Sequence, residues 1–123
     1  MKRTVLVIED NEQNLYLMNF ILEHRGYRVI QARDGAAALE AARKIKPDLI
    51  LLDIQLPEMD GYTVARLLRA GHDFELIPII AVTSYAMVGD REKAIEAGCT
   101  GYIEKPINPD TFVLEMEKYL QPG

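Results

Sequence analysis

The sequence predicts an α/β domain in which a parallel sheet is covered by helices on both faces. Short apolar runs alternate along the chain with longer segments whose apolar residues recur at helical spacing. Three of the runs are nearly continuous blocks of Val, Ile and Leu, which is typical of parallel strands buried on both faces. The chain has 123 residues and is 49% hydrophobic, so it can bury one core but is too short for two domains.

Five apolar runs are the predicted strands. In chain order they are Val5–Ile8, Tyr27–Ala32, Leu49–Leu52, Ile77–Val82 and Tyr102–Ile103. The runs that begin at Tyr27 and Tyr102 are weaker than the other three, so we expect them at the edges of the sheet. Because parallel crossovers are right-handed, the connecting helices are expected on both faces of an open sheet.

Five predicted helices follow the strands, each with an apolar stripe at helical spacing. The stripes comprise Leu15, Met18, Ile21 and Leu22; Ala36, Leu39, Ala42 and Ile45; Val64, Leu67 and Leu68; Ala94, Ile95 and Ala97; and Phe112, Val113, Met116, Tyr119 and Leu120. The expected helix starts are Asp34, and Asn108 with Pro109; the expected stops are Gly26, Pro47, Gly71 and Gly98. Every interval between strands is thus assigned to a helix, which gives five β/α units.

Composition excludes several classes of function. Lys and Arg number 14 and Asp and Glu number 19, so the net charge of −5 argues against a nucleic-acid or anionic membrane surface. A single cysteine, Cys99, cannot form an intrachain disulfide, which favours a reducing compartment. We find neither a signal-peptide pattern nor an apolar stretch of membrane-spanning length, so a cytoplasmic protein is expected.

Polar residues follow four of the five predicted strands directly. In order along the chain they are Glu9-Asp10, Asp53, Thr83-Ser84 and Glu104-Lys105-Pro106. In an open parallel sheet the ligand site lies beyond the carboxyl ends of the strands, where the strand order reverses. These residues are therefore expected to share one pocket.

Three carboxylates, a hydroxyl and an ammonium in one pocket suit phosphoryl chemistry. Carboxylates brought close together repel one another, and Mg²⁺, which prefers oxygen ligands, relieves that repulsion. A carboxylate can also attack phosphorus and form an aspartyl phosphate. Taken singly, each residue has an ordinary alternative: a helix cap, a strand residue or a surface lysine. Strand alternation places only one of Thr83 and Ser84 in the pocket, and the spacing leaves open which one.

Five blocks of the chain resemble the response-regulator receiver domain of two-component signalling. They are Val7-Ile8-Glu9-Asp10-Asn11, Pro47-Asp48-Leu49-Ile50-Leu51-Leu52-Asp53, Leu56-Pro57-Glu58-Met59-Asp60-Gly61, Ile79-Ile80-Ala81-Val82-Thr83 and Gly98-Cys99-Thr100-Gly101-Tyr102-Ile103-Glu104-Lys105-Pro106. The resemblance covers essentially the whole chain and implies one receiver (response regulatory) domain over residues 1–123. It also implies a flavodoxin-like (βα)5 fold, a doubly wound parallel sheet with strand order 2-1-3-4-5.

The resemblance implies a role for each pocket residue. Asp53 would be the phosphoacceptor, and Asp53, Glu9, Asp10 and the backbone carbonyl of Gln55 would hold Mg²⁺. Thr83 would be the switch hydroxyl, Lys105 the phosphoryl-binding lysine and Tyr102 the switch aromatic. Pro106 would follow a cis peptide bond, Gly61 would allow a tight turn after the acceptor, and Tyr85 would shield the phosphoryl group from water.

The resemblance also implies a function in a phosphorelay. The phosphoryl donor would be a histidine kinase or a histidine phosphotransfer protein, docked on the helix around Leu15 to Ile21. The signal would leave by contact with a downstream protein target or by onward phosphotransfer, and an output domain is not expected in this chain. Its only reactions would be self-phosphorylation from a donor and slow autodephosphorylation, so it is not expected to be an enzyme. Single-domain receivers of bacterial cell-cycle control and receivers of hybrid histidine kinases carry similar motifs.

Two other classes of protein fit less well. Phosphatases with an aspartate nucleophile usually carry a second acid two residues later, where this chain has Gln55, and a substrate cap that this length cannot supply. A flavodoxin-like nucleotide binder needs a hydroxyl- or glycine-rich phosphate loop after the first strand. The loop here, Glu9-Asp10-Asn11-Glu12, would repel a phosphate.

Overall fold

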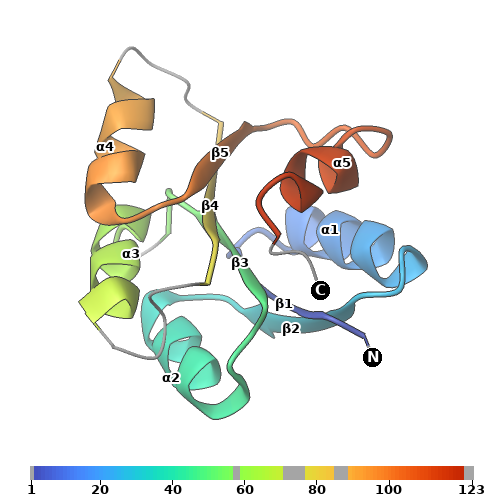
Figure 1. Cartoon of the computed structure of the whole chain (residues 1–123), viewed down its shortest axis with the longest axis horizontal. Helices are drawn as coiled ribbons and strands as arrows, with labels where there is room; N and C mark the ends of the chain where they lie inside the picture. The colour runs from blue at the N-terminus through green and yellow to red at the C-terminus, as the bar shows by residue number, and fades with distance from the viewer. Residues whose placement is uncertain (1, 57–58, 71–76, 85–88, 121–123) are drawn as a thin grey trace.

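The computed structural model describes residues 2–56, 59–70, 77–84 and 89–120. Its strands are β1 (Thr4–Ile8), β2 (Arg28–Ala32), β3 (Leu49–Asp53), β4 (Ile79–Thr83) and β5 (Gly101–Glu104). Its helices are α1 (Glu12–His24), α2 (Gly35–Ile45), α3 (Gly61–Ala70), α4 (Asp90–Ala97) and α5 (Phe112–Glu117). Strands and helices alternate along the chain, as the apolar runs predict (Figure 1).

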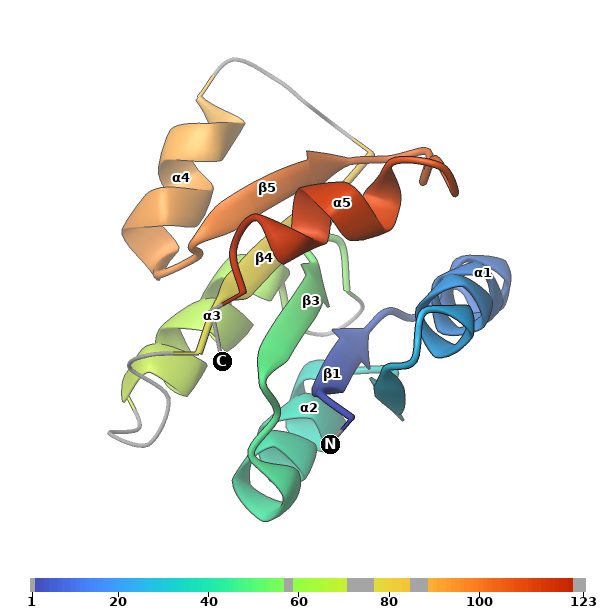
Figure 2. The ribbon, with the colours of Figure 1, turned by 45° about the vertical axis from the view of Figure 1, so that its right-hand side comes forward.

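All five strands are parallel and lie in the order β2-β1-β3-β4-β5, which confirms the predicted topology. Helices α1 and α5 cover one face of the sheet, and α2, α3 and α4 cover the other (Figures 1 and 2). β3 and β4 are buried along their whole length, whereas β2 and β5 are partly exposed at the edges. The two weaker runs are therefore the edge strands, as expected.

Alternate residues of the central strands feed two separate cores. In β3, Ile50 and Leu52 pack into the core beneath α2, α3 and α4, whereas Leu49 and Leu51 pack beneath α1 and α5. Because successive side chains of a strand point to opposite faces, a strand covered on both faces must be apolar throughout. This is the physical reason for the unbroken apolar runs in the sequence.

The helix ends agree with the sequence in part. Asp34 caps α2 by accepting a hydrogen bond from the Ala37 N–H at 2.8 Å, and Gly98 ends α4 in a left-handed conformation with φ of 109°. Asn11 caps α1 by accepting from Asn14 N–H at 2.9 Å. The expected stop at Gly71 lies outside the described residues.

The prediction for the fifth helix is wrong at its start. Helix α5 begins at Phe112, not at Asn108 or Pro109. The Asn108 side chain accepts from the Asp110 N–H at 2.9 Å, and its carbonyl accepts from Phe112 N–H at 2.9 Å. Asn108 thus closes a turn before the helix. Its side chain accepts from the N–H of Asp110, which precedes the first residue of α5, so it does not cap the helix itself. The expected inward stripe holds: Phe112, Val113 and Met116 are buried.

Tyr27 lies just before β2 rather than in it. Its N–H donates to the Leu22 carbonyl at 3.1 Å, which closes the end of α1. Its ring is buried in the core beneath α1 and α5, and its hydroxyl donates to Glu117 Oε2 at 2.5 Å. The aromatic residue that marks the start of this run therefore joins α1 to α5.

Candidate functional site

The strand ends bring the predicted acids together. Ile8 of β1 pairs with Leu52 of β3. The next residue after each, Glu9 and Asp53, therefore lies beside the other. On the other side, Asp53 pairs with Val82 of β4, next to Thr83. The Lys105 N–H donates to the Thr83 carbonyl at 2.8 Å, which continues the ladder beyond β5. Parallel pairing alone thus places four of the predicted site residues at one edge of the sheet.

A buried ion-pair cluster forms the centre of the site. Lys105 Nζ lies 2.7 Å from Glu9 Oε1 and 3.6 Å from Asp53 Oδ2. The side chains of Glu9 and Asp53 are 0% and 3% exposed, and that of Lys105 is 9% exposed. Buried carboxylates are stabilised only when they are paired or hydrogen-bonded, so the ammonium holds this pair of acids in place.

Each buried carboxylate has one oxygen held by a backbone N–H two residues further on. Asn11 N–H donates to Glu9 Oε2 at 3.2 Å, and Gln55 N–H donates to Asp53 Oδ1 at 2.9 Å. The second oxygen of each carboxylate faces Lys105. This matched arrangement fixes both carboxylates and directs one oxygen of each toward the same point.

Two buried carboxylates, those of Glu9 and Asp53, face the single ammonium of Lys105, so the cluster carries an excess of negative charge when both acids are ionised. Burial raises the pKa of Glu9 from 4.5 to about 7, with a further rise from the neighbouring Asp53 and an opposing effect of Lys105. One ammonium therefore does not balance the buried carboxylates at neutral pH. A further cation, or a proton on Glu9, would balance the charge of these carboxylates.

The acidic residues fit a divalent cation. Carboxylate oxygens of Glu9, Asp10 and Asp53 lie within 4.8 Å of one another, and Asp10 is exposed at the mouth of the cluster. Glu9 Oε1 is buried and, among the described residues, accepts no hydrogen bond of good geometry beyond its ion pair with Lys105. An under-satisfied buried oxygen beside two further carboxylates is a donor set that suits Mg²⁺.

Thr83, Tyr102 and Pro106 lie in or just after β4 and β5. Thr83 is buried at the end of β4, whereas Ser84, the next residue, is exposed. Tyr102 is half-buried in β5 against the core beneath α2, α3 and α4. The Lys105-Pro106 peptide bond is cis. Tyr85 lies outside the described residues.

Gly61 closes the loop that follows Asp53. Its N–H donates to the Ile54 carbonyl at 2.9 Å. A Cβ at this position would lie 2.5 Å from Ile54 Cα and 2.6 Å from the Asp53 carbonyl oxygen, closer than atoms can approach. Only glycine fits here without moving the backbone of Asp53 and Ile54.

The role of Asn11 is one that the sequence motif did not reveal. Its N–H holds Glu9 and its side chain caps α1, so one residue links the acidic pair to the helix that follows. An Asn at the expected N-cap position, directly after two acids, is the signal that could have indicated this.

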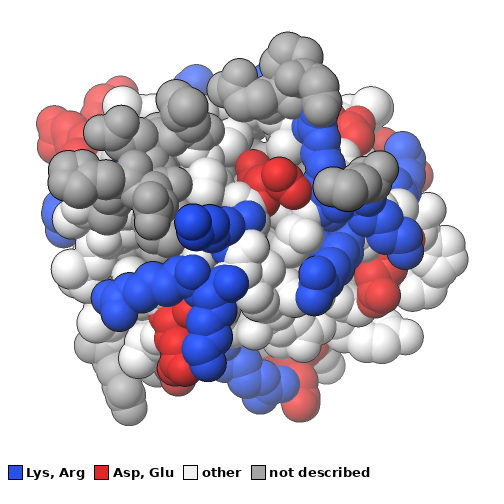
Figure 3. Space-filling model, turned by 60° about the horizontal axis from the view of Figure 1, so that its bottom comes forward, with Lys and Arg blue, Asp and Glu red and all other residues white. Residues whose placement is uncertain are grey.

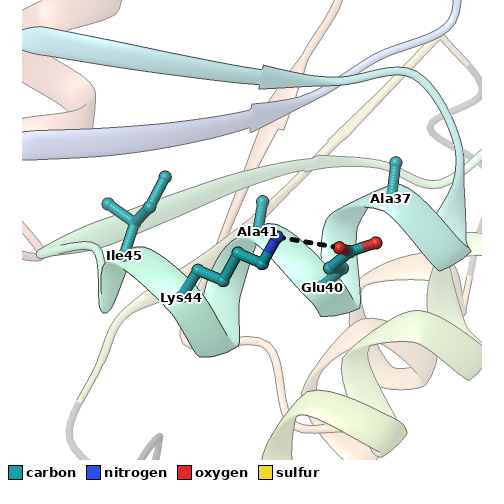
Figure 4. A pocket seen from close by; sticks show the side chains of 5 residues that line it. All are labelled: Ala37, Glu40, Ala41, Lys44 and Ile45. Atoms are coloured by element: carbon teal, nitrogen blue, oxygen red, sulfur yellow. Dashed lines mark ion pairs between the residues drawn. The ribbon is translucent and has the colours of Figure 1, made fainter.

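A hollow away from the strand ends lies on the surface of α2 (Figure 4). It is lined by Ala37, Glu40, Ala41, Lys44 and Ile45. Its two charged groups pair with each other, Lys44 Nζ lying 3.0 Å from Glu40 Oε1 on the exposed surface. Nothing in this hollow matches the convergent charges at the strand ends.

Together, the fold and the cluster at the carboxyl ends of the strands define a class of protein. It is the doubly wound α/β domain with acids and a lysine gathered where the strand order reverses. Residues 5–117 match the response regulator receiver domain, and the chain therefore belongs to that family.

Known proteins of two kinds are similar over nearly the whole chain. The polar-differentiation response regulators DivK of Brucella anthropi and Brucella ovis are each 44% identical over 120 residues, covering 98% of this chain and 98% of the relative. The chemotaxis response regulator CheY4 of Vibrio cholerae superposes with a TM-score of 0.93 at 28% identity, covering 98% and 100% of the two chains.

A second similar structure contains a metal. It is the receiver domain of the sensor histidine kinase PA1611 of Pseudomonas aeruginosa, which has a magnesium ion coordinated in its active-site cleft. It superposes with a TM-score of 0.89 at 34% identity, covering 97% of this chain and 98% of that one. The chain is thus a response-regulator receiver domain similar to DivK. In its described part, no helix is both long enough and apolar enough to cross a membrane.

Proposed function

We propose that Asp53 accepts a phosphoryl group from a phosphohistidine on a histidine kinase or a histidine phosphotransfer protein. The observation that carries this proposal is the position of Asp53: Oδ1 is held by Gln55 N–H, while Oδ2 faces Lys105 Nζ at 3.6 Å. In the transfer, an Asp53 oxygen forms a bond to phosphorus. The phosphorus–nitrogen bond of the donor breaks, and its electron pair stays on the imidazole.

The acids around Asp53 form the proposed metal site. Glu9, Asp10, Asp53 and the backbone carbonyl of Gln55 would hold Mg²⁺. The bound cation supplies positive charge that offsets the carboxylates and the phosphoryl oxygens. Because Glu9 is fixed by Asn11 and Lys105, its carboxylate is already in place before any ligand arrives.

Lys105 and Thr83 are the proposed partners of the phosphoryl oxygens. The Lys105 ammonium is nearly buried, so its charge is little screened by water and neutralises charge that develops on the group in transfer. The Thr83 hydroxyl follows the phosphoryl group, and Tyr102 then turns inward into the space that opens. This shift favours an active arrangement of α4, β5 and α5, which we propose as the output surface for a downstream protein target or for onward phosphotransfer.

Helix α1 is the proposed docking surface for the phosphohistidine protein. Tyr16 and Phe20 are 73% and 50% exposed, with ring centroids 6.5 Å apart, and Phe20 lies 4.2 Å from the His24 ring. Exposed rings one helical turn apart offer a large apolar contact at low entropic cost. Changing Phe20 to Ala should weaken binding of the donor protein and leave labelling by a small phosphodonor unchanged.

Several finer assignments are part of the same proposal. Residues 1–123 would form one receiver (response regulatory) domain in the cytoplasm, with a cell-cycle role like that of DivK and a receiver of a hybrid kinase as the alternative. Its chemistry would be limited to self-phosphorylation and slow autodephosphorylation. Tyr85 would shield the phosphoryl group, so Tyr85→Ala should speed dephosphorylation; an unchanged rate would contradict this role.

Phosphorylation by acetyl phosphate tests the proposal directly. The protein is incubated with Mg²⁺ and acetyl phosphate, and intact mass is measured. We expect a labile gain of one phosphoryl group that Asp53→Asn abolishes and that Asp110→Asn, at an exposed position in the turn before α5, retains. A gain that survives in Asp53→Asn would assign the acceptor elsewhere, and no gain in the unmodified protein would exclude the function.

A further inference from the structure

The side of the sheet formed by the amino ends of its strands is basic. This side is called the amino edge, and the opposite side, where the carboxyl ends of the strands carry the acidic pocket, is called the carboxyl edge. Lys2 and Arg3 precede β1, Arg25 and Arg28 flank the turn into β2, and Lys46 precedes β3. Because β2, β1 and β3 are neighbours in a parallel sheet, their amino ends lie side by side. These five residues are named here the amino-edge basic patch. Figure 3 looks onto this side of the molecule, where blue Lys and Arg side chains predominate over red ones.

The patch is largely exposed, and its side chains form no ion pair with the residues that the structure describes. Four of its side chains are exposed and that of Arg3 is half-buried. In the part of the chain that the structure describes, its cations form no ion pair, whereas Arg33, Lys44 and Lys105 each pair with a carboxylate. Five positive charges thus lie together, although the chain as a whole carries −5.

The patch already accommodates one carboxylate of this chain. Glu117 Oε2 accepts a hydrogen bond from the Tyr27 hydroxyl at 2.5 Å. Arg3 and Arg25 lie close enough to Tyr27 for their charges to oppose the rise in its pKa. Arg28 is tied to Arg3 through the backbone, its N–H donating to the Arg3 carbonyl at 2.9 Å. One carboxylate of this chain, that of Glu117, therefore lies beside the patch, held by the Tyr27 hydroxyl and without an ion pair to the guanidinium groups among the described residues.

We propose that the amino-edge basic patch binds an acidic segment of a partner protein. Guanidinium groups bind carboxylates through paired hydrogen bonds, and three arginines lie in the patch. A short acidic segment matches a patch of five residues, whereas an extended nucleic-acid backbone would run past the patch onto the rest of a chain whose net charge is −5. The partner would leave the acidic pocket free, since the two sites lie at opposite edges of the sheet.

Binding of a fluorescein-labelled decaglutamate peptide to the full chain tests the proposal. Fluorescence anisotropy is measured at low and at physiological salt for the unmodified protein, Arg28→Glu and Arg66→Glu. Arg66 is exposed on α3 and gives a matched change of charge away from the patch. We expect Arg28→Glu to weaken binding about tenfold, Arg66→Glu to change it less than about twofold, and added salt to weaken it in all three.

Other outcomes would overturn the proposal. Equal weakening by Arg28→Glu and Arg66→Glu would mean that the peptide responds to net charge alone. If binding of the peptide does not saturate, the patch is not a binding site for it. Tighter binding through Arg28 to a DNA duplex or to phosphatidylserine vesicles would assign the patch to another class of ligand. Self-association that Arg28→Glu abolishes would assign it to a second copy of this chain. Acetyl phosphate labelling reports the Asp53 pocket separately, so the two proposals can fail independently.

Discussion

The two edges of the sheet carry charge in opposite ways. At the carboxyl edge, Glu9, Asp53 and Lys105 are buried and fixed by a few short contacts. At the amino edge, Arg25 and Arg28 are exposed and form no ion pair among the described residues. Burial makes the first set sensitive to each proton and each cation, whereas water screens the second. Substitutions at the carboxyl edge should therefore have large effects, and those at the amino edge small ones.

Two glycines give the largest expected contrast between the edges. Gly61→Ala places a methyl group 2.5 Å from Ile54 Cα, so the backbone beside Asp53 must move, and we expect a loss of about 3 kcal/mol of unfolding free energy. Gly26 has φ of +87° but nothing within 4 Å of its Cβ position, so Gly26→Ala should lose only about 1 kcal/mol, through backbone strain. Urea unfolding of both variants measures the difference, and equal losses would contradict it.

The pH dependence of stability is the next test of the carboxyl edge. Burial raises the pKa of Glu9 to about 7 in the folded protein, against 4.5 when it is exposed. Between these values the folded state binds more protons than the unfolded state, so the free energy of unfolding falls as pH rises. In EDTA we expect Glu9 to contribute a loss on the order of 2 kcal/mol between pH 4.5 and 7.

Glu9→Gln and Mg²⁺ provide the controls for this dependence. Glu9→Gln removes the titrating group, so the variant should lose this part of the slope in urea titrations at several pH values. Mg²⁺ should reduce the slope in the unmodified protein, because a bound cation favours the ionised carboxylate, and should raise the free energy of unfolding. A slope that is the same in Glu9→Gln would assign the titration to another group.

The sequence predicts the carboxyl edge better than the amino edge, for a physical reason. Glu9, Asp53 and Thr83 each follow directly on an apolar run, so strand order alone brings them together. The choice of Thr83 over Ser84 and the start of α5 depend on tertiary burial and on local side-chain hydrogen bonds, which the pattern does not contain.

The amino edge is not visible in the sequence because its charges come from three separate segments. Arg3, Arg28 and Lys46 meet only through the parallel order of β1, β2 and β3. A net charge of −5 averages over this patch and over the acidic pocket together. The net charge therefore describes the local charge of neither edge. The expectation that nucleic acids and membranes are not ligands stays a prediction.

A substitution at Tyr27 tests the hydrogen bond between two side chains beside the basic patch. Tyr27→Phe keeps the buried ring and removes the hydroxyl that donates to Glu117 at 2.5 Å. Because Glu117 is exposed and water can replace the lost donor, we expect a loss of about 1 kcal/mol of unfolding free energy. Urea unfolding at neutral pH measures it, with Glu117→Gln as the matched change on the other side. A loss as large as that of Gly61→Ala would show that the amino edge is as constrained as the carboxyl edge.

The smallest expected effect belongs to an ion pair that lies at the surface. Arg33 and Glu12 approach to 2.8 Å, but their side chains are 56% and 82% exposed. Solvent screening and the ordering of two long side chains offset the attraction, so Arg33→Ala should change the free energy of unfolding by less than about 0.5 kcal/mol. A double-mutant cycle with Glu12→Ala isolates the pair from other effects of the two substitutions. The buried Lys105–Glu9 pair has a nearly identical separation of 2.7 Å. If the coupling energy of Arg33–Glu12 were as large as that of Lys105–Glu9, distance and not burial would determine the strength of these ion pairs.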